Sequence, residues 1–407
     1  MSLTAGDNYP PNERKLARSR LFHHFTTFIA AQLVWVDNHQ NPWRRFICPL
    51  AAKSACVFYA VLATAAANIH VKLDSNSPGK AIFLNRLTEY RQKALLFLTD
   101  HLAQARRYND REDAEVKIQG FRESLATTIL LWHLEMHFPL DSAWKIHLRT
   151  AQALIYSHRL TSALHMQFDE CETFLLQEFY CATIWPRLTL NIEVQDAALT
   201  LPLGNGGDAF IGFVRLMHRL ILLTTRKKGD IDTESTKVAF RITELESEAS
   251  EIRQSVLKIL AKSELAYSGY QYDDMLHVVD AWFYAILIFG YQVIGPTCEM
   301  GDFIQSDCDC LFQALESLST PLSFAQNQPW PLFIAGTECA GDKHRQTWIE
   351  SRFHALIQNI CPLDRPRMLE FLKEWWNDHD AGNGYGRPGC WLEFIHKAQS
   401  HQDFIIW

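Results

Sequence analysis

The stretch TESTKVAFRITELESEASEIRQSVLKILAK, residues 233–262, carries apolar residues at alternating steps of four and three positions. Because an α-helix completes a turn about every 3.6 residues, this spacing gathers the apolar side chains into one stripe. The stripe consists of Val238, Ile242, Leu245, Ala249, Ile252, Val256 and Ile259. It covers only about three heptads. We therefore expect a long surface helix within residues 233–265 that packs this stripe on the body of the protein, with a homodimer through the same helix as the alternative.

Apolar residues recur at helical spacing along almost the whole chain, whereas alternating β-branched runs of strand length are hard to find. We predict an all-α fold, a single large multi-helical body of about 12–15 helices with two lobes. The predicted helices cover residues 13–35, 49–70, 78–106, 117–137, 142–158, 168–185, 208–225, 233–265, 272–293, 304–317, 330–340, 344–360, 365–377 and 389–399.

The best candidate boundary within this body is LPLGNGG, residues 201–207, because glycine and asparagine interrupt helices. We expect an N-terminal tail at residues 1–19 and two helical halves, residues 20–203 and 204–407. An apolar helix resumes directly after the glycines, so we expect no flexible linker between the halves.

Two segments approach the composition of a membrane span, SACVFYAVLATAAANIH at residues 54–70 and AWFYAILIFGYQVIG at residues 281–295. Both are shorter than the roughly 18 to 20 apolar residues that cross a bilayer. We expect buried core helices in both places and no membrane partner.

The composition is that of a folded protein with an acidic balance. Of 407 residues 48% are hydrophobic, and the formal net charge is -7. Long-range electrostatics would repel a nucleic-acid duplex, so no direct nucleic-acid binding is expected. Several of the ten cysteines lie in apolar helical patterns, and the N-terminus lacks an apolar signal-peptide core. These features predict an intracellular protein with reduced thiols.

No cofactor motif is found in a suitable context. A literal G-x-G-x-x-G occurs at residues 384–389, but the preceding FLKEWWNDH is helical in pattern, whereas a dinucleotide site needs a strand there. P-loop and G-x-S-x-G motifs are absent from the sequence. We expect no cofactor.

HLEMH at residues 133–137 is the cluster that most resembles a catalytic or metal site. His133 and His137 share one helix face, and His147 or His158 could supply a third metal ligand. Glu135 lies on another face, which removes the general-base geometry of zinc proteases. Ordinary helix-end histidines are the favoured interpretation, and no metal is expected.

The acidic segment CEMGDFIQSDCDC, residues 298–310, is interpreted as a solvated loop, since a C-x-C step is too tight for a zinc knuckle. In QPWPLFIAGTECAG, residues 328–341, Pro329 and Pro331 predict the start of a helix. Gly336 would allow a close helix approach or leave room beside Trp330, and Glu338 is expected near the helix N-terminus, where the helix dipole favours a carboxylate. A ligand pocket beside Trp330 is the alternative.

Four stretches in chain order resemble the fungal-specific transcription factor domain, the regulatory region of zinc-cluster regulators. They are NPWRRFICPLAAKSACVFYAVLATAAANIH, ESLATTILLWHLEMHFPLDSAWKIHLRTAQALI, LPLGNGGDAFIGFVRLMHRL and QPWPLFIAGTECAGDKHRQTWIESRF. The resemblance implies an all-helical regulatory domain that senses small molecules or contacts the transcription machinery. It also implies a nuclear location, with the cytoplasm as the alternative. Family regulators usually carry six N-terminal cysteines that hold two zinc ions, whereas the first cysteine here is Cys48.

The sequence therefore leaves three functions open. The first is a transcription-regulator-like domain without its own zinc cluster, linked to fungal secondary metabolism, which acts through a small hydrophobic ligand, the transcription machinery or a related regulator. The second is a cofactor-independent cyclase or isomerase of fungal secondary metabolism on the same helical fold. The third is a truncated zinc-cluster regulator. Candidate ligand-binding residues are Trp43, Arg44, Trp144 and Trp330, and candidate catalytic residues are His133, His147 and Glu338.

Overall fold

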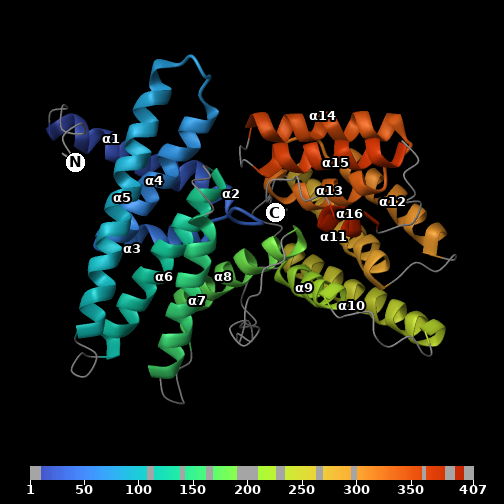
Figure 1. The fold of residues 1–407 in the computed structure, drawn as a ribbon, viewed down its shortest axis with the longest axis horizontal. Coiled ribbons are helices and arrows are strands. Elements are labelled where there is room, and N and C mark those ends of the chain that lie inside the picture. The colour runs from blue at the N-terminus through green and yellow to red at the C-terminus, as the bar shows by residue number, and fades with distance from the viewer. Residues whose placement is uncertain are drawn as a thin grey trace. The chain divides into compact units, whose positions relative to one another are not determined.

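The computed structural model describes residues 11–107, 114–137, 143–161, 168–189, 210–225, 234–262, 269–294, 300–359, 364–380 and 390–397. These residues form helices joined by turns and short irregular segments, with no strand among them (Figure 1). The all-α prediction is confirmed. The expected boundary at 201–207 and the glycine motif at 384–389 lie outside the described residues.

The described residues belong to two compact units, and the division falls inside helix α8 (Glu170–Thr189), between Thr183 and Ile184. Unit 1 contains the described helices before α8 and the first part of α8. These helices are α1 (Pro11–His24), η1 (Phe25–Ile29), α2 (Ala30–Gln32), η2 (Trp43–Ile47), α3 (Cys48–Lys53), α4 (Ala55–Lys72), α5 (Pro78–Arg107), α6 (Ala114–His137) and α7 (Ala143–Thr161).

Helix α4 is central in unit 1 and packs against α1, α3, α5 and α6. Its sequence is rich in alanine, and most of its residues are buried, including the polar Asn68. Small side chains let neighbouring helices approach closely, and a helix that is apolar on all sides belongs in a core. The prediction of a buried helix at 54–70 is confirmed.

Unit 2 contains the described residues from Ile184 onward. Its helices after α8 are α9 (Ile211–Thr225), α10 (Glu234–Lys262), α11 (Gly269–Ile294), α12 (Met300–Glu316), η5 (Ala325–Asn327), α13 (Pro329–Thr337), α14 (Lys343–Asn359), α15 (Asp364–Asp380) and α16 (Cys390–Lys397). Helix α11 packs against α9, α10, α12 and α13. It holds the second apolar segment, as predicted for a core helix.

Two described helices are long and apolar enough to cross a membrane, Ala55–Lys72 and the segment Gln271–Ile294 of α11. In each, 67% of the apolar window is buried inside the fold. A core helix meets the same criteria of length and composition, and the packing of α4 and α11 explains their apolar sequences.

Helix α10 packs its apolar stripe on helices α9 and α11 of the same chain. Leu245, Ala249 and Val256 are buried, and Ile259 is exposed. A Cβ added to Gly290 of α11 would meet the side chain of Leu245, so these two helices approach closely. The interpretation as a surface helix packed on the body is confirmed.

The acidic segment expected to be a solvated loop forms the first part of α12 from Met300 onward, so that interpretation was wrong. Ile304, Cys308 and Leu311 recur at helical spacing and are buried. The aspartates of this segment lie on the more exposed faces of the helix, away from the buried apolar residues, so a helix accommodates both.

Candidate functional site

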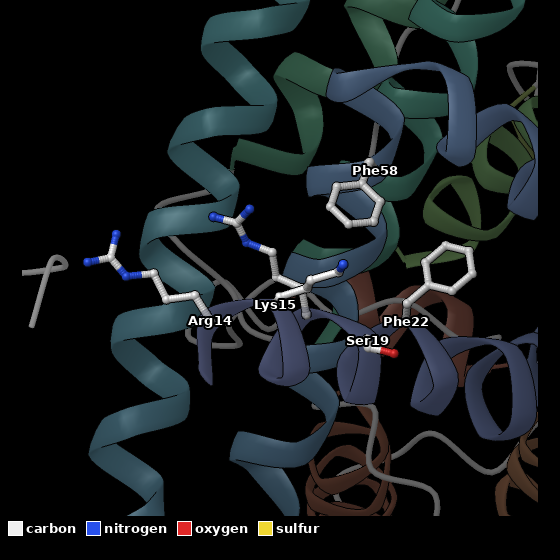
Figure 2. A pocket seen from close by; sticks show the side chains of 6 residues that line it. Arg14, Lys15, Ser19, Phe22 and Phe58 are labelled. Carbon is white, nitrogen blue, oxygen red and sulfur yellow. The ribbon is translucent and has the colours of Figure 1, made fainter. Parts of the chain in front are cut away.

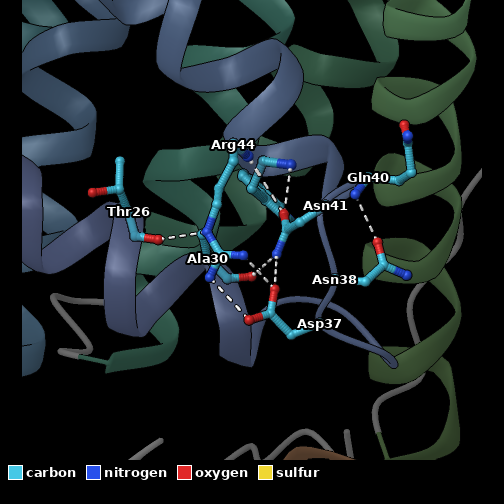
Figure 3. A network of polar contacts seen from close by, with 8 residues as sticks. Thr26, Ala30, Asp37, Asn38, Gln40, Asn41 and Arg44 are labelled. Carbon is cyan, nitrogen blue, oxygen red and sulfur yellow. Dashed lines mark hydrogen bonds and ion pairs between the residues drawn. The ribbon is translucent and has the colours of Figure 1, made fainter. Parts of the chain in front are cut away.

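Asn41 organises the first group of predicted site residues, in unit 1. Its side chain is buried, and its Nδ2 donates hydrogen bonds to the carbonyl oxygen of Ala30 and to Oδ1 of Asp37, each at 2.8 Å (Figure 3). Its Oδ1 accepts the backbone N–H of Trp43 at 3.0 Å. Asn41 therefore caps the helix that begins at Pro42, an arrangement that asparagine before an N-terminal proline favours.

Trp43 is fully buried beneath this cap. Its Nε1 donates a hydrogen bond to the carbonyl oxygen of Leu33 at 3.1 Å. Its ring meets Phe25, His133 and Phe174 edge to face, with the centroid of the His133 ring at 5.2 Å. The indole therefore joins residues that are far apart in the sequence.

Arg44 extends the same network. Its Nε donates to the carbonyl oxygen of Thr26 at 2.7 Å, and its two terminal nitrogens contact the two oxygens of Asp37 at 2.6 and 2.9 Å (Figure 3). Thr26 lies in the π-helical segment η1, and Arg44 lies in the π-helical segment η2. The hydrogen bond from Arg44 to Thr26 links these two π-helical segments, and the bidentate pair with Asp37 holds the guanidinium in place.

His133 lies on α6 next to a carboxyl group of α8. Its Nε2 is 3.7 Å from Oε2 of Glu178. Burial lowers the pKa of His133 to about 3 and raises the pKa of Glu178 to about 8. At neutral pH the imidazole is therefore neutral, and the Glu178 carboxyl retains its proton, so that it can act as a hydrogen-bond donor.

Glu135 points away from this arrangement, as the sequence analysis expected. It is buried and accepts from Nε of Arg91 at 3.0 Å, and Nε2 of His147 lies 3.8 Å from it. Trp144 is buried on α7 as well, with Nζ of Lys145 5.2 Å from its ring. The side chain of His137 lies outside the described residues, and the described part of the chain contains no group of three side chains suited to hold a metal ion.

In unit 2, Trp330 is fully buried near the start of α13. Its ring packs beside those of Trp185, Trp282 and Phe289. A Cβ added at Gly336 would lie 2.6 Å from Cδ1 of Leu372 on α15. Of the two roles considered for Gly336, the close helix approach is the one observed.

Glu338 is the C-cap of α13, so its expected position near the N-terminus was wrong. Its Oε1 accepts a hydrogen bond from Nε2 of Gln292 at 2.6 Å, and Oε1 of Gln292 accepts one from Nε1 of Trp391 at 2.9 Å. Burial raises the pKa of Glu338 to about 7, although the hydrogen bonds from Gln292 and Thr337 act in the opposite direction. A helix C-terminus also disfavours a negative charge.

The predicted residues thus belong to two different units, each with its own core. Unit 1 contains Trp43, Arg44, His133, Trp144 and His147, and unit 2 contains Trp330 and Glu338. Within unit 1 the ring of Trp43 contacts that of His133, and Nε2 of His147 lies 3.8 Å from Oε1 of Glu135.

A pocket that no sequence pattern predicted lies in unit 1 between α1 and α4, with a volume of about 650 Å³. We call it the α1 pocket. It is lined by Arg14, Lys15, Arg18, Ser19, Phe22 and Phe58 (Figure 2). The available signal was the basic cluster RKLAR at residues 14–18, but Phe58 of the apolar wall comes from α4, 36 to 44 residues further along the chain than the other lining residues.

A second hollow of about 380 Å³ lies around the start of α8 and contains charges of both signs. Arg45 pairs with Glu170 at 2.5 Å, and Arg122 pairs with Asp169 at 2.7 Å. Since these charges neutralise each other, this hollow is less suited than the α1 pocket to hold a charged ligand.

Comparison with known proteins gives one match. A family model described as the fungal specific transcription factor domain matches residues 20–404. No curated protein and no solved structure matches the chain.

Proposed function

The chain belongs to the fungal specific transcription factor domain family, and we propose that it is a helical regulatory domain that responds to a small-molecule ligand or a protein partner in the nucleus. The single observation that supports this function is the extent of the family match, which covers residues 20–404 of 407. Such coverage gives the whole helical fold, rather than an isolated motif, a transcription-regulator-like role.

We further propose that promoter recognition depends on a partner protein. The formal net charge of -7 over the 407 residues disfavours approach to a duplex. A related regulator with a DNA-binding domain would supply the contact with the promoter. Genes of fungal secondary metabolism are the proposed targets. The α1 pocket has the size of sites that hold small organic molecules, which supports the proposed ligand response.

A tethering assay tests the regulatory function. The chain is fused to a heterologous DNA-binding domain in a fungal host with a matching reporter gene. The reporter should change at least several-fold relative to the DNA-binding domain alone. Equal reporter output for the fusion and for the DNA-binding domain alone would contradict the proposal, provided that both proteins accumulate to the same level.

An enzymatic role, as a cyclase or isomerase, is the second candidate. It is supported by Glu178, whose carboxyl group keeps its proton at neutral pH beside the ring of His133. A protonated carboxyl in an apolar environment can serve as a general acid. Incubation of the purified chain with metabolite extracts of its host separates the two functions. Turnover that is lost in Glu178→Gln supports the enzyme. Saturable binding without turnover supports the ligand-responsive regulatory domain.

A further inference from the structure

The α1 pocket combines cationic and apolar walls in one small space. Arg14, Lys15, Arg18, Ser19 and Phe22 come from one side of α1, and Phe58 comes from α4 (Figure 2). Arg14, Arg18 and Phe22 are spaced four residues apart, so they follow one face of the helix. The charged end and the apolar end of the pocket therefore lie along the same helix.

The charge at this site is opposite to that of the chain as a whole. Helix α1 has the sequence PNERKLARSRLFHH, with four arginine and lysine residues and a single glutamate, whereas the chain has a formal net charge of -7. Among the residues that the structure describes, Lys15 and Arg18 form no ion pair with a carboxylate. The positive charge of these two side chains is available to a ligand.

Arg18 is also held in position without using all its hydrogen-bond donors. Its guanidinium carbon lies 5.7 Å from the centre of the Tyr59 ring. Its Nε is buried and has no hydrogen-bond acceptor within the described structure. A buried N–H without an acceptor is costly, and the guanidinium keeps this donor unused within the described fold.

The apolar wall is formed by two aromatic rings. Phe22 and Phe58 stack with their centroids 6.1 Å apart, and both side chains remain partly exposed. Partly exposed stacked rings offer a flat surface to an aromatic or aliphatic group. The pocket thus presents an apolar surface next to a cationic end.

The size of the pocket and the spacing of its charges identify the kind of ligand. A volume of about 650 Å³ lies within the range of about 300–1,000 Å³ for small-molecule sites. Lys15 and Arg18 are separated by only about 4.5 Å along the helix axis, from the rise of about 1.5 Å per residue. This separation matches one acidic group, whereas an acidic peptide would need a longer row of cations.

We propose that the α1 pocket binds a small organic acid, with its anionic group held by Lys15 and Arg18 and its apolar body packed on Phe22 and Phe58. The inference rests on the proposed ligand response and names its ligand class. Arg14, Lys15 and Arg18 all precede residue 20, where the family match begins, so the cationic end lies outside the matched residues.

Calorimetric titration of the purified full chain tests the proposal with 2-naphthoate and with its neutral analogue 2-naphthamide. The naphthoate should bind at least about tenfold more tightly, because the neutral amide cannot make the charge-assisted contacts with Lys15 and Arg18. Its affinity should fall as salt is added. Equal affinities for the acid and the amide would overturn the proposal, and so would tighter binding of a glutamate-rich helical peptide or of inorganic phosphate.

Two charge-removing variants and one matched control locate the site. Lys15→Gln and Arg18→Gln should each weaken naphthoate binding about tenfold. Arg20→Gln removes the same charge from an exposed position of α1 that does not line the pocket, and it should leave the affinity within twofold. Lys15 is exposed, so its variant should fold normally. Equal loss in Arg20→Gln and Lys15→Gln would show a non-specific charge effect and overturn the assignment.

Failure of this proposal can be distinguished from failure of the regulatory function. Binding is measured on the isolated chain, whereas regulation is measured by the tethered reporter. A chain that changes the reporter but does not prefer naphthoate over naphthamide retains its regulatory role and loses the organic-acid ligand.

Discussion

Replacement of Glu338 by glutamine should make the protein less sensitive to rising pH. In the wild type, Glu338 lies at the C-terminal end of α13 and accepts a hydrogen bond from Gln292 at 2.6 Å. A glutamine at this position keeps an oxygen that can accept that bond, and it cannot acquire a negative charge. The substitution therefore changes the titration of the site while it preserves its shape.

The direction of the effect follows from the pKa of Glu338, which burial raises from 4.5 to about 7. The folded protein binds the proton more tightly than the unfolded chain does. The stabilisation from this carboxyl is fully present below about pH 4.5 and is lost as the pH rises through about 7. A pKa change of this size corresponds to on the order of 3 kcal/mol at most. Since Glu338 is partly exposed, solvent screening reduces the expected effect to about 1–2 kcal/mol.

Urea denaturation of the wild type and of Glu338→Gln at several pH values between 4 and 8 measures this effect. Between pH 5 and pH 8, the free energy of unfolding of the variant should rise by about 1–2 kcal/mol relative to that of the wild type. Below about pH 4.5 the difference between the two proteins should be constant, which serves as an internal control. A difference that is constant over the whole range would show that Glu338 titrates as an ordinary solvated carboxyl, and the reasoning would be refuted.

Three further substitutions test the packing. Gly336→Ala should lower the free energy of unfolding by about 1–3 kcal/mol, because its Cβ would lie 2.6 Å from Cδ1 of the buried Leu372. A Cβ added at Gly301 in helix α12 would have no atom within 4 Å, so Gly301→Ala should leave the free energy of unfolding unchanged or raise it by up to about 1 kcal/mol in a urea titration. A loss equal to that of Gly336→Ala would contradict the close-contact explanation. Asn41→Ala removes the helix cap and the hydrogen bond to the carbonyl of Ala30, and should cost about 1–3 kcal/mol. An unchanged urea midpoint for this variant would show that the cap is dispensable.

The sequence predicts the helices well where a local pattern determines them. The stripe of α10 lies on one face because its spacing follows the helical repeat, and Leu245 and Val256 are buried where that spacing predicts. The start of α13 at Pro329 also follows from a local rule, since proline is tolerated in the first turn. Such features need no knowledge of what packs against them.

The end of α13 could not be predicted in the same way. The expected helix continues to residue 340, whereas the structure ends it at Thr337. That shift of three residues changes the position of Glu338 from the interior of a helix to its C-cap, where the dipole disfavours a carboxylate. The nitrogen that binds it belongs to Gln292, 46 residues earlier, so no local pattern could reveal the contact.

The candidate site residues show a related limit. Trp43 and Arg44 stand out in the sequence because aromatic and cationic side chains often bind ligands. In the structure Trp43 is buried against Phe174 and His133, and Arg44 binds Asp37 and the backbone of Thr26. Residue type identifies side chains capable of strong contacts, but it does not distinguish contacts within the fold from contacts with a ligand.

The α1 pocket shows why net charge alone is a poor guide to small ligands. The formal charge of -7 governs the approach of a long polyanion, whose charges extend well beyond the screening distance of about 8 Å at physiological salt. A single carboxylate next to Arg18 lies within that distance of the α1 cations, so they set most of the potential it experiences. An acidic chain can therefore repel nucleic acid and still bind a small organic acid. Two variants separate these properties. Arg18→Gln and Arg20→Gln each make the net charge more negative by one unit, but only Arg18→Gln removes a contact in the pocket. A comparable loss of naphthoate affinity in both variants would show that the overall charge dominates.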